Sequence, residues 1–242
     1  MNKKKMRKLT SGILTVVVFF MIAGSCSEEE LVADGVGDAF IVARRSGEGT
    51  GIVYGLALHA FGNKSFSKVT AKLPGNGIRE LSSYNGYTYD FYSETPEAEF
   101  SATPPVKGNY EFSFSFVGGE TDADTDVLGD QVLAPATITN CAWDATNARI
   151  NVEWTKPDQA DYFVISLEDP EGNVVFTSEA LGASKISHEI SATTSHWYEQ
   201  PRNGVSYKVI LDAFMYESNE AHLNIQAKSV TSAAAVWGVA GS

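Results

Sequence analysis

The sequence is poor in the residue types that carry most catalytic and metal chemistry. It has two cysteines and four histidines among 242 residues, and no histidine stands near a cysteine or at the spacing of a helical zinc motif. No Gly-x-Ser-x-Gly nucleophile elbow occurs. The glycine-rich stretch 46–51 leads into a strand pattern, whereas a phosphate cradle needs a helix N-terminus. We therefore expect no catalytic residues, no bound metal and no cofactor.

Basic residues are scarce beyond the first 25 positions. Five of the 18 basic residues and none of the 30 acidic ones lie in residues 1–25, so residues 26–242 hold 13 basic against 30 acidic residues, a net charge of −17. Such a surface repels phosphate backbones and anionic lipid. Nucleic acid is therefore excluded as an expected partner.

The N-terminus has the pattern of a secretory signal peptide, residues 1–25. Five basic residues at positions 3–8 precede the apolar run Ile13–Ala23, which is too short to span a bilayer. The stretch Ala23-Gly24-Ser25-Cys26 resembles the lipobox of bacterial lipoproteins, although Leu is more usual where Ala23 stands. The resemblance implies that the thiol of Cys26 is acylated and anchors the mature chain in a membrane. An ordinary signal peptide with an incidental cysteine is the alternative.

A short acidic run follows the expected anchor. Ser27, Glu28, Glu29 and Glu30 resemble the export tag that sends surface lipoproteins to the outer face of some bacteria with two membranes. The resemblance implies an outer-membrane lipoprotein that faces the cell exterior, with residues 26–37 as an acidic tether. A solvated tether with no sorting role is the alternative. If Cys26 is acylated, Cys141 stands alone, and no intramolecular disulfide can form.

Alternation of apolar and polar residues predicts an all-β mature chain. Tyr110, Phe112, Phe114 and Phe116 alternate with polar residues, and similar patterns cover 52–58 and 87–92. Gly- and Pro-rich turns separate these runs, which is typical of sandwiches. We expect two tandem immunoglobulin-like β-sandwiches at 38–117 and 135–242.

The segment 118–134 is acidic and contains several glycines. It predicts a linker between the two sandwiches, or a long exposed loop. Asp122, Asp124 and Asp126 look like the start of a calcium loop, but Val127 and Leu133 stand where an EF-hand needs Gly and Glu. An interdomain calcium site built from the three aspartates is the alternative to a solvated linker.

The second half resembles a fibronectin type III domain from Pro135 to Trp237. The matching pieces are Pro135, the strand and turn 152–157 with Trp154, Tyr162 on the third strand, and 207–213 with Tyr207 on the sixth. The resemblance implies that Trp154 is a core residue, with Tyr162 and Tyr207 nearby, and that the hydroxyl of Tyr207 bonds across a corner. Pro201 lies six residues before Tyr207 instead of the usual four, which loosens the corner assignment.

Aromatic rings outside the alternating core are the candidate ligand-binding residues. Trp197 and Tyr198 stand in a polar context, and Tyr84 and Tyr92 fall off the main alternation. Packing between sheet and loop is the alternative for all four.

We expect a non-catalytic binding or interaction module: a spacer, an adhesion module or a subunit of a complex. An accessory glycan-binding lipoprotein of a polysaccharide-uptake system is the second hypothesis, so the expected partners are the membrane, through the anchor, and polysaccharide or other envelope proteins. A glycoside-active enzyme is the third, because its carboxylate pair would leave no short motif.

Overall fold

The computed structural model describes residues 31–47, 51–218 and 224–239. The predicted signal peptide, Cys26 and the acidic residues Ser27 to Glu30 lie outside these ranges. Contacts divide the chain into Met1–Val32 and a compact unit, Ala33–Ser242. Within the described ranges, no helix has the length and hydrophobicity needed to cross a membrane.

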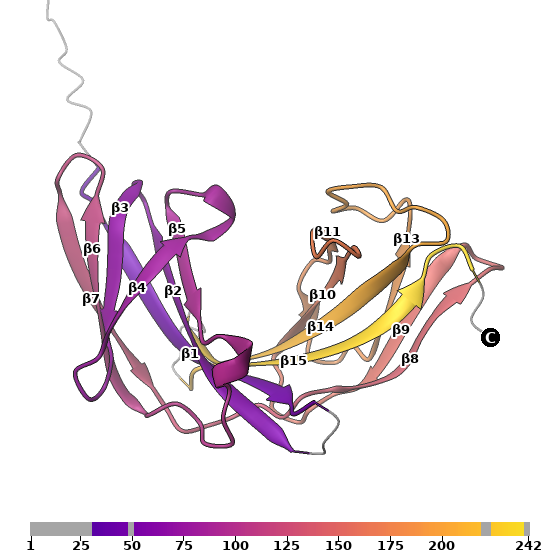
Figure 1. Ribbon diagram of the computed structural model, residues 1–242, viewed down its shortest axis with the longest axis horizontal. Helices are drawn as coiled ribbons and strands as arrows, with labels where there is room; N and C mark the ends of the chain where they lie inside the picture. The colour runs from indigo at the N-terminus through magenta and orange to yellow at the C-terminus, as the bar shows by residue number, and fades with distance from the viewer. Residues whose placement is uncertain (1–30, 48–50, 219–223, 240–242) are drawn as a thin grey trace, which may run out of the picture. The chain divides into compact units, whose positions relative to one another are not determined.

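The compact unit is built from strands, which confirms the all-β prediction and the sandwich-like sheets. The first half contains β1 (Gly35–Arg45), β2 (Ile52–Gly62), β3 (Phe66–Lys72), β4 (Ile78–Ser83), β5 (Asp90–Glu94), β6 (Gly108–Phe116) and β7 (Thr121–Leu128), with the short 3-10 turns η1 (Tyr84–Gly86) and η2 (Glu97–Glu99). The second half contains β8 (Thr137–Asp144), β9 (Arg149–Thr155), β10 (Tyr162–Glu168), β11 (Val174–Thr177), β12 (Leu181–Gly182), β13 (Ser187–Ser191), β14 (Ser206–Tyr216) and β15 (Ile225–Val236). Figure 1 shows these strands in order along the chain.

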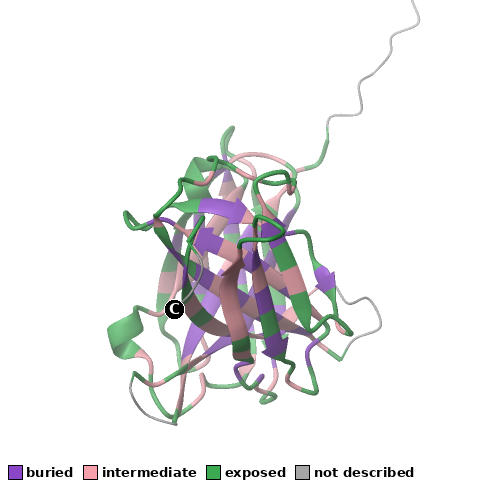
Figure 2. Ribbon diagram, turned by 90° about the vertical axis from the view of Figure 1, so that its right-hand side faces the viewer, coloured by how far each residue is buried: buried purple, intermediate pink, exposed green. Residues whose placement is uncertain are grey.

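The strand cores follow the period-two pattern of the sequence. The four aromatic residues of β6, Tyr110 to Phe116, are each buried, while Glu111 and Ser113 between them are exposed. Figure 2 shows buried positions alternating with more exposed ones along the strands. The alternation is the direct result of burying one face of each strand.

The second half has the two-sheet arrangement of an immunoglobulin-like sandwich. A three-stranded sheet of order β13-β9-β8 lies apart from the run β11-β10-β14-β15 of the larger sheet. Trp154 is 3 % exposed, as predicted, and its ring packs against Phe163 at 5.4 Å between centroids. The hydroxyl of Tyr207 accepts the backbone N–H of Arg202 at 2.9 Å. The core position of Trp154 and the corner bond of Tyr207 are both confirmed.

Tyr162 does not lie beside Trp154. Successive residues of β10 point to opposite faces, so Phe163 enters the core and Tyr162 points to the other side. There the Tyr162 ring stacks on Phe214 of β14, at 4.6 Å and nearly parallel.

The segment 118–134 is not a plain linker, because it contains β7. This strand pairs antiparallel with β6 from Gly108↔Leu128 to Ser115↔Thr121. Its aspartates also reach β1: the carboxylates of Asp122, Asp124 and Asp126 accept the backbone N–H groups of Gly35, Gly37 and Ala39 at 2.9, 3.0 and 2.8 Å. The predicted solvated stretch is therefore a structural ladder of hydrogen bonds.

Strand β1 joins the two halves into one sheet. Its residues Ile41–Arg44 pair in parallel with Ala227–Val230 of β15, while its whole length pairs antiparallel with β2. The sheet order runs without interruption as β11-β10-β14-β15-β1-β2-β5-β4-β3-β6-β7. The two predicted sandwiches thus share hydrogen-bonded strands.

Candidate functional site

Two of the predicted ligand residues, Tyr84 and Tyr92, lie together. Tyr84 begins the turn η1 after β4, and Tyr92 is the central residue of β5. Their ring centroids are 5.5 Å apart with an interplanar angle of 61°. Tyr84 is exposed and Tyr92 is half-buried beneath it. The β4–β5 connection is therefore the place where the structure gathers aromatic side chains at the surface.

Two rings of β2 extend this group. His59 lies opposite Tyr92 in the register of β2 and β5, and Phe61 lies opposite Asp90. The centroids of His59 and Tyr92 are 6.1 Å apart, and those of His59 and Phe61 are 5.9 Å apart. Because alternate residues of a strand share a face, His59 and Phe61 continue the row that Tyr84 and Tyr92 begin.

A second pair of rings, Tyr87 and Tyr89, stands next to this row in the chain. The alternation of 87–92 predicts a strand, but β5 begins only at Asp90. Of the three residues expected on the core side, Phe91 alone is half-buried, with its ring 5.5 Å from Phe66. Tyr87 and Tyr89 are exposed instead, with centroids 5.8 Å apart.

We call these residues the aromatic surface. Its exposed rings are Phe61 (45 %), Tyr84 (46 %), Tyr87 (53 %) and Tyr89 (52 %), and His59 and Tyr92 are its half-buried members. Three of the exposed members, Phe61, Tyr87 and Tyr89, are absent from the sequence-based candidates. The alternation of 87–92 assigns the two tyrosines to a strand, and the pattern at 52–58 ends before Phe61. The cluster Tyr-x-x-Tyr-x-Tyr around Gly86 was the signal that could have identified two of them.

The backbone holds the turn of the aromatic surface in place. The N–H of Gly62 donates to the carbonyl of Tyr89 at 3.0 Å, and the N–H of Phe66 donates to the carbonyl of Thr88 at 2.6 Å. The N–H of Tyr87 closes the turn on the carbonyl of Tyr84 at 2.9 Å. The Gly62 bond continues the register of β2 and β5 by one residue, whereas the bonds of Phe66 and Tyr87 belong to the turn. Together they fix the backbone of the tyrosines before any ligand arrives.

Charged groups flank the half-buried rings. The His59 Nε2 and Asp90 Oδ1 atoms are 2.8 Å apart. The Tyr92 hydroxyl donates to the carboxylate of Glu94 at 2.5 Å, and Arg44 pairs with the other oxygen at 2.6 Å. Burial first, and then the negative charge of Glu94, raise the pKa of the Tyr92 hydroxyl far above its usual range. Tyr92 is therefore a fixed, neutral hydrogen-bond donor below the exposed rings.

Trp197 and Tyr198 differ sharply in exposure. Trp197 is half-buried: its indole N–H donates to the carbonyl of Ser191 at 2.9 Å, and its ring packs between Phe176 and Trp237 at 4.9 and 5.4 Å. Tyr198 is 71 % exposed, and its backbone N–H is bonded to Val175. The contacts of Trp197 are those of a packing residue, so Tyr198 is the member of this pair that presents its side chain to solvent.

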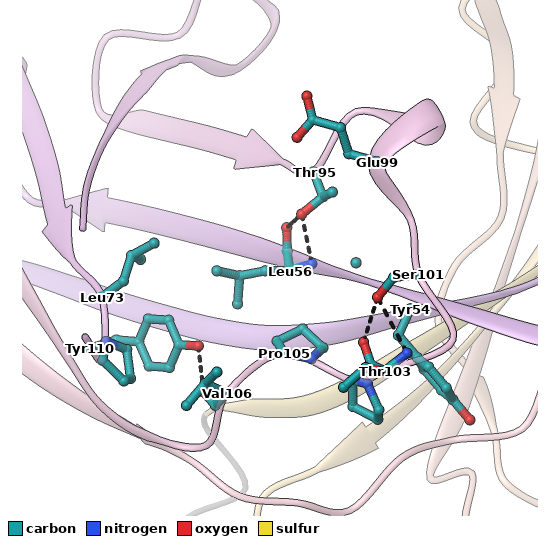
Figure 3. A pocket seen from close by; sticks show the side chains of 13 residues that line it. Tyr54, Leu56, Leu73, Thr95, Glu99, Ser101, Thr103, Pro105, Val106 and Tyr110 are labelled. Carbon is teal, nitrogen blue, oxygen red and sulfur yellow. Dashed lines mark hydrogen bonds between the residues drawn. The ribbon is translucent and has the colours of Figure 1, made fainter. Parts of the chain in front are cut away.

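A separate hollow lies where β2 meets the 95–106 segment. Its volume is about 340 Å³, and its walls include Tyr54, Leu56, Leu73, Pro105 and Tyr110. Figure 3 shows the bond from the Tyr110 hydroxyl to the Val106 carbonyl, 2.7 Å long, and the bonds between Thr95 and Leu56. Among the described residues that line it, Glu99 supplies the single carboxyl group.

No cluster of three or more His, Cys, Asp or Glu side chains suited to a metal ion occurs within residues 31–47, 51–218 and 224–239. The carboxylates of Asp122, Asp124 and Asp126, the calcium alternative of the sequence, each accept a backbone N–H of β1. The three carboxylates therefore hold β7 against β1.

Comparison with known proteins assigns no family: neither a protein-family profile nor a curated protein matches the chain. Similar solved structures include a two-domain fibronectin type III segment of chicken tenascin, which is 14 % identical, with 74 % of this chain and 90 % of that one covered and a TM-score of 0.29. A BSP domain of a biofilm-associated protein is 14 % identical, with 87 % and 30 % covered and a TM-score of 0.23. A tetra-tandem repeat from the extending region of a large adhesion protein is 14 % identical, with 83 % and 50 % covered and a TM-score of 0.25. The chain thus spans half or less of the last two. Sequence identities and TM-scores this low carry no conclusion about function.

Proposed function

We propose that this protein is a non-catalytic binding module that is lipid-anchored through Cys26, faces the cell exterior from the outer membrane, and holds its partner at the aromatic surface. The observation that carries the binding role is the set of exposed rings around the β4–β5 connection. Phe61 lies near the end of β2, and Tyr84, Tyr87 and Tyr89 lie in the connection, whose backbone hydrogen bonds hold it in place. Exposed apolar side chains gathered in one region mark interaction sites, and aromatic rings supply large contact areas at low entropic cost.

The hollow at Tyr54 supports a binding role over catalysis. Hydrolysis of glycosides needs two carboxyl groups across the scissile bond, and Glu99 is the single acidic residue among those described around this hollow. The two carboxylates beside the aromatic surface are both engaged, Asp90 with His59 and Glu94 with Tyr92 and Arg44. The hollow and the aromatic surface are therefore better suited to holding a ligand than to catalysis by a pair of carboxyl groups, one acting as acid and the other as base or nucleophile.

The anchor and its sorting rest on the sequence of residues 1–30. Cys26→Ser should remove fatty-acid label from the protein and release it from membranes, because the thiol is the acylated group. Metabolic labelling with a fatty acid measures this, and equal label in the parent and the variant would contradict the anchor.

Surface display of the protein is tested separately. Changing Glu28, Glu29 and Glu30 to Ala should protect the protein from protease added to intact cells. Undiminished cleavage of the triple variant would show that the acidic run is a tether with no sorting role.

The binding role is tested on the full chain in its native envelope. The triple variant Phe61→Ala, Tyr87→Ala, Tyr89→Ala should lose its cross-linked partners or its retention on polysaccharide, whichever the parent shows. Ile78→Ala is the matched control, because Ile78 is an exposed apolar residue on β4 outside the surface. Tyr198→Ala tests the other exposed candidate in parallel. A parent that binds neither envelope protein nor polysaccharide would contradict the proposal.

A further inference from the structure

Strand β15 has an open edge beyond the point where β1 leaves it. β1 pairs with Ala227–Val230 of β15, whereas β14 pairs with β15 from Ile225 to Val236. Figure 1 shows β15 running on past the end of β1. Within the described part of the chain, no strand pairs with the side of Thr231–Val236 that faces away from β14. A row of backbone groups on β15 is therefore left without a neighbouring strand.

The backbone bonds of Trp237 show which residues face this open edge. The N–H of Trp237 donates to the carbonyl of Val205 at 2.9 Å, in the register of β14 and β15. In an antiparallel pair, residues alternate between bonding the neighbouring strand and facing away from it, so every second residue counted back from Trp237 bonds β14. The residues between them direct their N–H and carbonyl groups to the open edge, and their side chains are exposed: Ser232, Ala234 and Val236.

The sequence of this edge holds nothing that blocks a further strand. Natural proteins protect open edges with charged residues, prolines or bulges. The stretch Thr231–Val236 contains no charged residue and no proline, and its pairing with β14 is regular throughout. Such an edge is a template for β-augmentation, in which an extended peptide adds a strand and main-chain hydrogen bonds supply the affinity.

The end of β1 closes the site at one side. A strand added at the open edge lies in line with β1, so the last residues of β1, Arg44 and Arg45, stand in its path. Beside them lies a hollow of about 410 Å³, whose walls also include Lys208, Thr231 and Ser232. An incoming chain must end at this hollow or turn aside.

The charges around the hollow favour a carboxylate. Three cations and one carboxyl group are among the described residues that line it: Arg44, Arg45, Lys208 and Glu97. Ion pairs with neighbouring carboxylates already engage Arg44 and Lys208. Arg45 is exposed and donates to the hydroxyl of Thr137 at 3.0 Å, and no ion pair with a described residue neutralises it. Its guanidinium is therefore available to a carboxylate that enters the hollow.

Strand direction decides which end of a partner enters the hollow. β15 runs on away from the end of β1, because the two strands are parallel. A partner strand antiparallel to β15 therefore runs toward β1 and places its C-terminus in the hollow. A parallel partner would bring its N-terminal ammonium group to a wall that carries three cations. Antiparallel pairing is also slightly more stable per residue.

We infer that the open edge of β15 binds the C-terminal end of an extended partner chain, antiparallel to β15, with the terminal carboxylate at Arg45. The inference goes beyond the proposed function, because it adds an interaction site on a different strand. A second copy of this chain fits the edge less well. The stretch Ser232–Val236 spans roughly 17 Å, which supplies little of the roughly 800 Å² that each subunit of a stable dimer buries, and chains whose residues 26–242 carry a net charge of −17 repel one another.

Fluorescence anisotropy with the purified full chain in detergent tests the terminal carboxylate. The probe is a labelled peptide of about six residues, with alternating Thr and Val for β-propensity. It is prepared with a free C-terminal carboxylate and, as the matched control, with a C-terminal amide. We expect the acid form to bind and the amide form to bind about tenfold or more weakly, because it loses a charge-assisted hydrogen bond. Arg45→Gln should abolish this preference, so that both forms bind equally.

The backbone part of the site is tested with Ala234→Pro. Proline removes an N–H that faces the open edge and none that bonds β14, so the fold should be retained while binding of the acid form falls by about tenfold or more. Ala234→Thr keeps the N–H and should bind like the parent. Hydrogen exchange gives a readout in the unaltered protein. The acid form should slow exchange of the Ser232, Ala234 and Val236 amides and leave Thr231 and Ala233 unchanged.

Three results would each overturn the inference: no binding of the acid form, equal binding of the acid and amide forms to the parent, or unchanged exchange at the open edge. A dimer of the parent that Ala234→Pro dissociates would assign the edge to a second copy instead. The triple variant Phe61→Ala, Tyr87→Ala, Tyr89→Ala should bind the peptide like the parent. Failure at this edge is therefore distinguishable from failure of the aromatic surface.

Discussion

The carboxyl group of Asp38 lies where β1 passes from the aspartates of β7 to the backbone of β15. It is 4 % exposed, and one oxygen accepts the backbone N–H of Ile225 at 3.0 Å. The other oxygen has no hydrogen-bond partner among the described residues. Burial, and then the negative charges of Asp126 and Glu217, raise the pKa of Asp38 from 3.8 to about 8. The folded protein therefore holds this proton at neutral pH.

The sign of the pH dependence follows from the raised pKa. Since the folded state binds the proton more tightly than the unfolded state, the stability that Asp38 contributes is complete below about pH 4 and is lost as the pH rises to about 8. Asp38→Asn keeps an oxygen for Ile225 and carries no charge, so it should be more stable than the parent at pH 8–9, and its denaturation midpoint should fall less between pH 5 and 9. Urea denaturation across this range measures the effect, whose upper limit is of the order of 5 kcal/mol. Parallel pH profiles for the two proteins would contradict it.

At the scale of the element, β7 shows what the sequence could and could not predict. Asp122, Asp124 and Asp126 alternate with Ala123, Thr125 and Val127 in the period of a strand, but aspartate is depleted in strands. Composition therefore favoured a linker. Strand β7 forms a hairpin with its neighbour β6, but the role of its aspartates depends on β1, more than 80 residues away, because the N–H groups of Gly35, Gly37 and Ala39 need acceptors. No local pattern carries that information.

The same contrast separates β6 from the aromatic surface. The alternation of β6 identifies its buried face directly, since Tyr110, Phe112, Phe114 and Phe116 all reach the core. The run Tyr87–Tyr92 has equally regular alternation, but Thr88 and Tyr89 lie in a turn, where the N–H of Phe66 binds the Thr88 carbonyl, and β5 begins only at Asp90. Two rings are exposed as a result. Exposure at this turn depends on non-local backbone bonds, which is why two of the site residues escaped prediction.

The aspartate ladder can be tested one step at a time. Asp124→Ala removes the acceptor of the Gly37 N–H and should lower the free energy of unfolding by about 1–3 kcal/mol, because a partly buried donor loses a charged partner. The Gly37 amide should also exchange its hydrogen faster. Asp124→Asn is the control, because its amide oxygen can still accept the bond, and it should retain most of the stability. Hydrogen exchange of the Gly35, Gly37 and Ala39 amides gives the readout, and an unchanged Gly37 rate in the Ala variant would contradict the ladder.

At the scale of the whole compact unit, the strands nearest the two ends of the described chain lie side by side. β1 and β15 pair in parallel although nearly the full sequence separates them. Glu94 of β5 adds side-chain links, because Arg44 of β1 lies 2.6 Å from it and Lys228 of β15 lies 4.0 Å from it. The tandem organisation expected from sequence implies two sandwiches that can unfold separately. A shared sheet implies that each half loses hydrogen bonds when the other unfolds.

Trp154→Ala distinguishes these two organisations. Trp154 is buried in the second half, far along the chain from β6 in the first half, and truncating a buried Trp costs about 3–5 kcal/mol. If β1 and β15 couple the halves, the variant should show one cooperative transition at a melting temperature lower by about 10 °C. Protection of amides in β6 and β14 should then fall together. Calorimetry combined with hydrogen exchange measures both effects. Two separate transitions, with β6 protected as in the parent while β14 is open, would show that the shared sheet does not couple the halves and that each sandwich is stable alone.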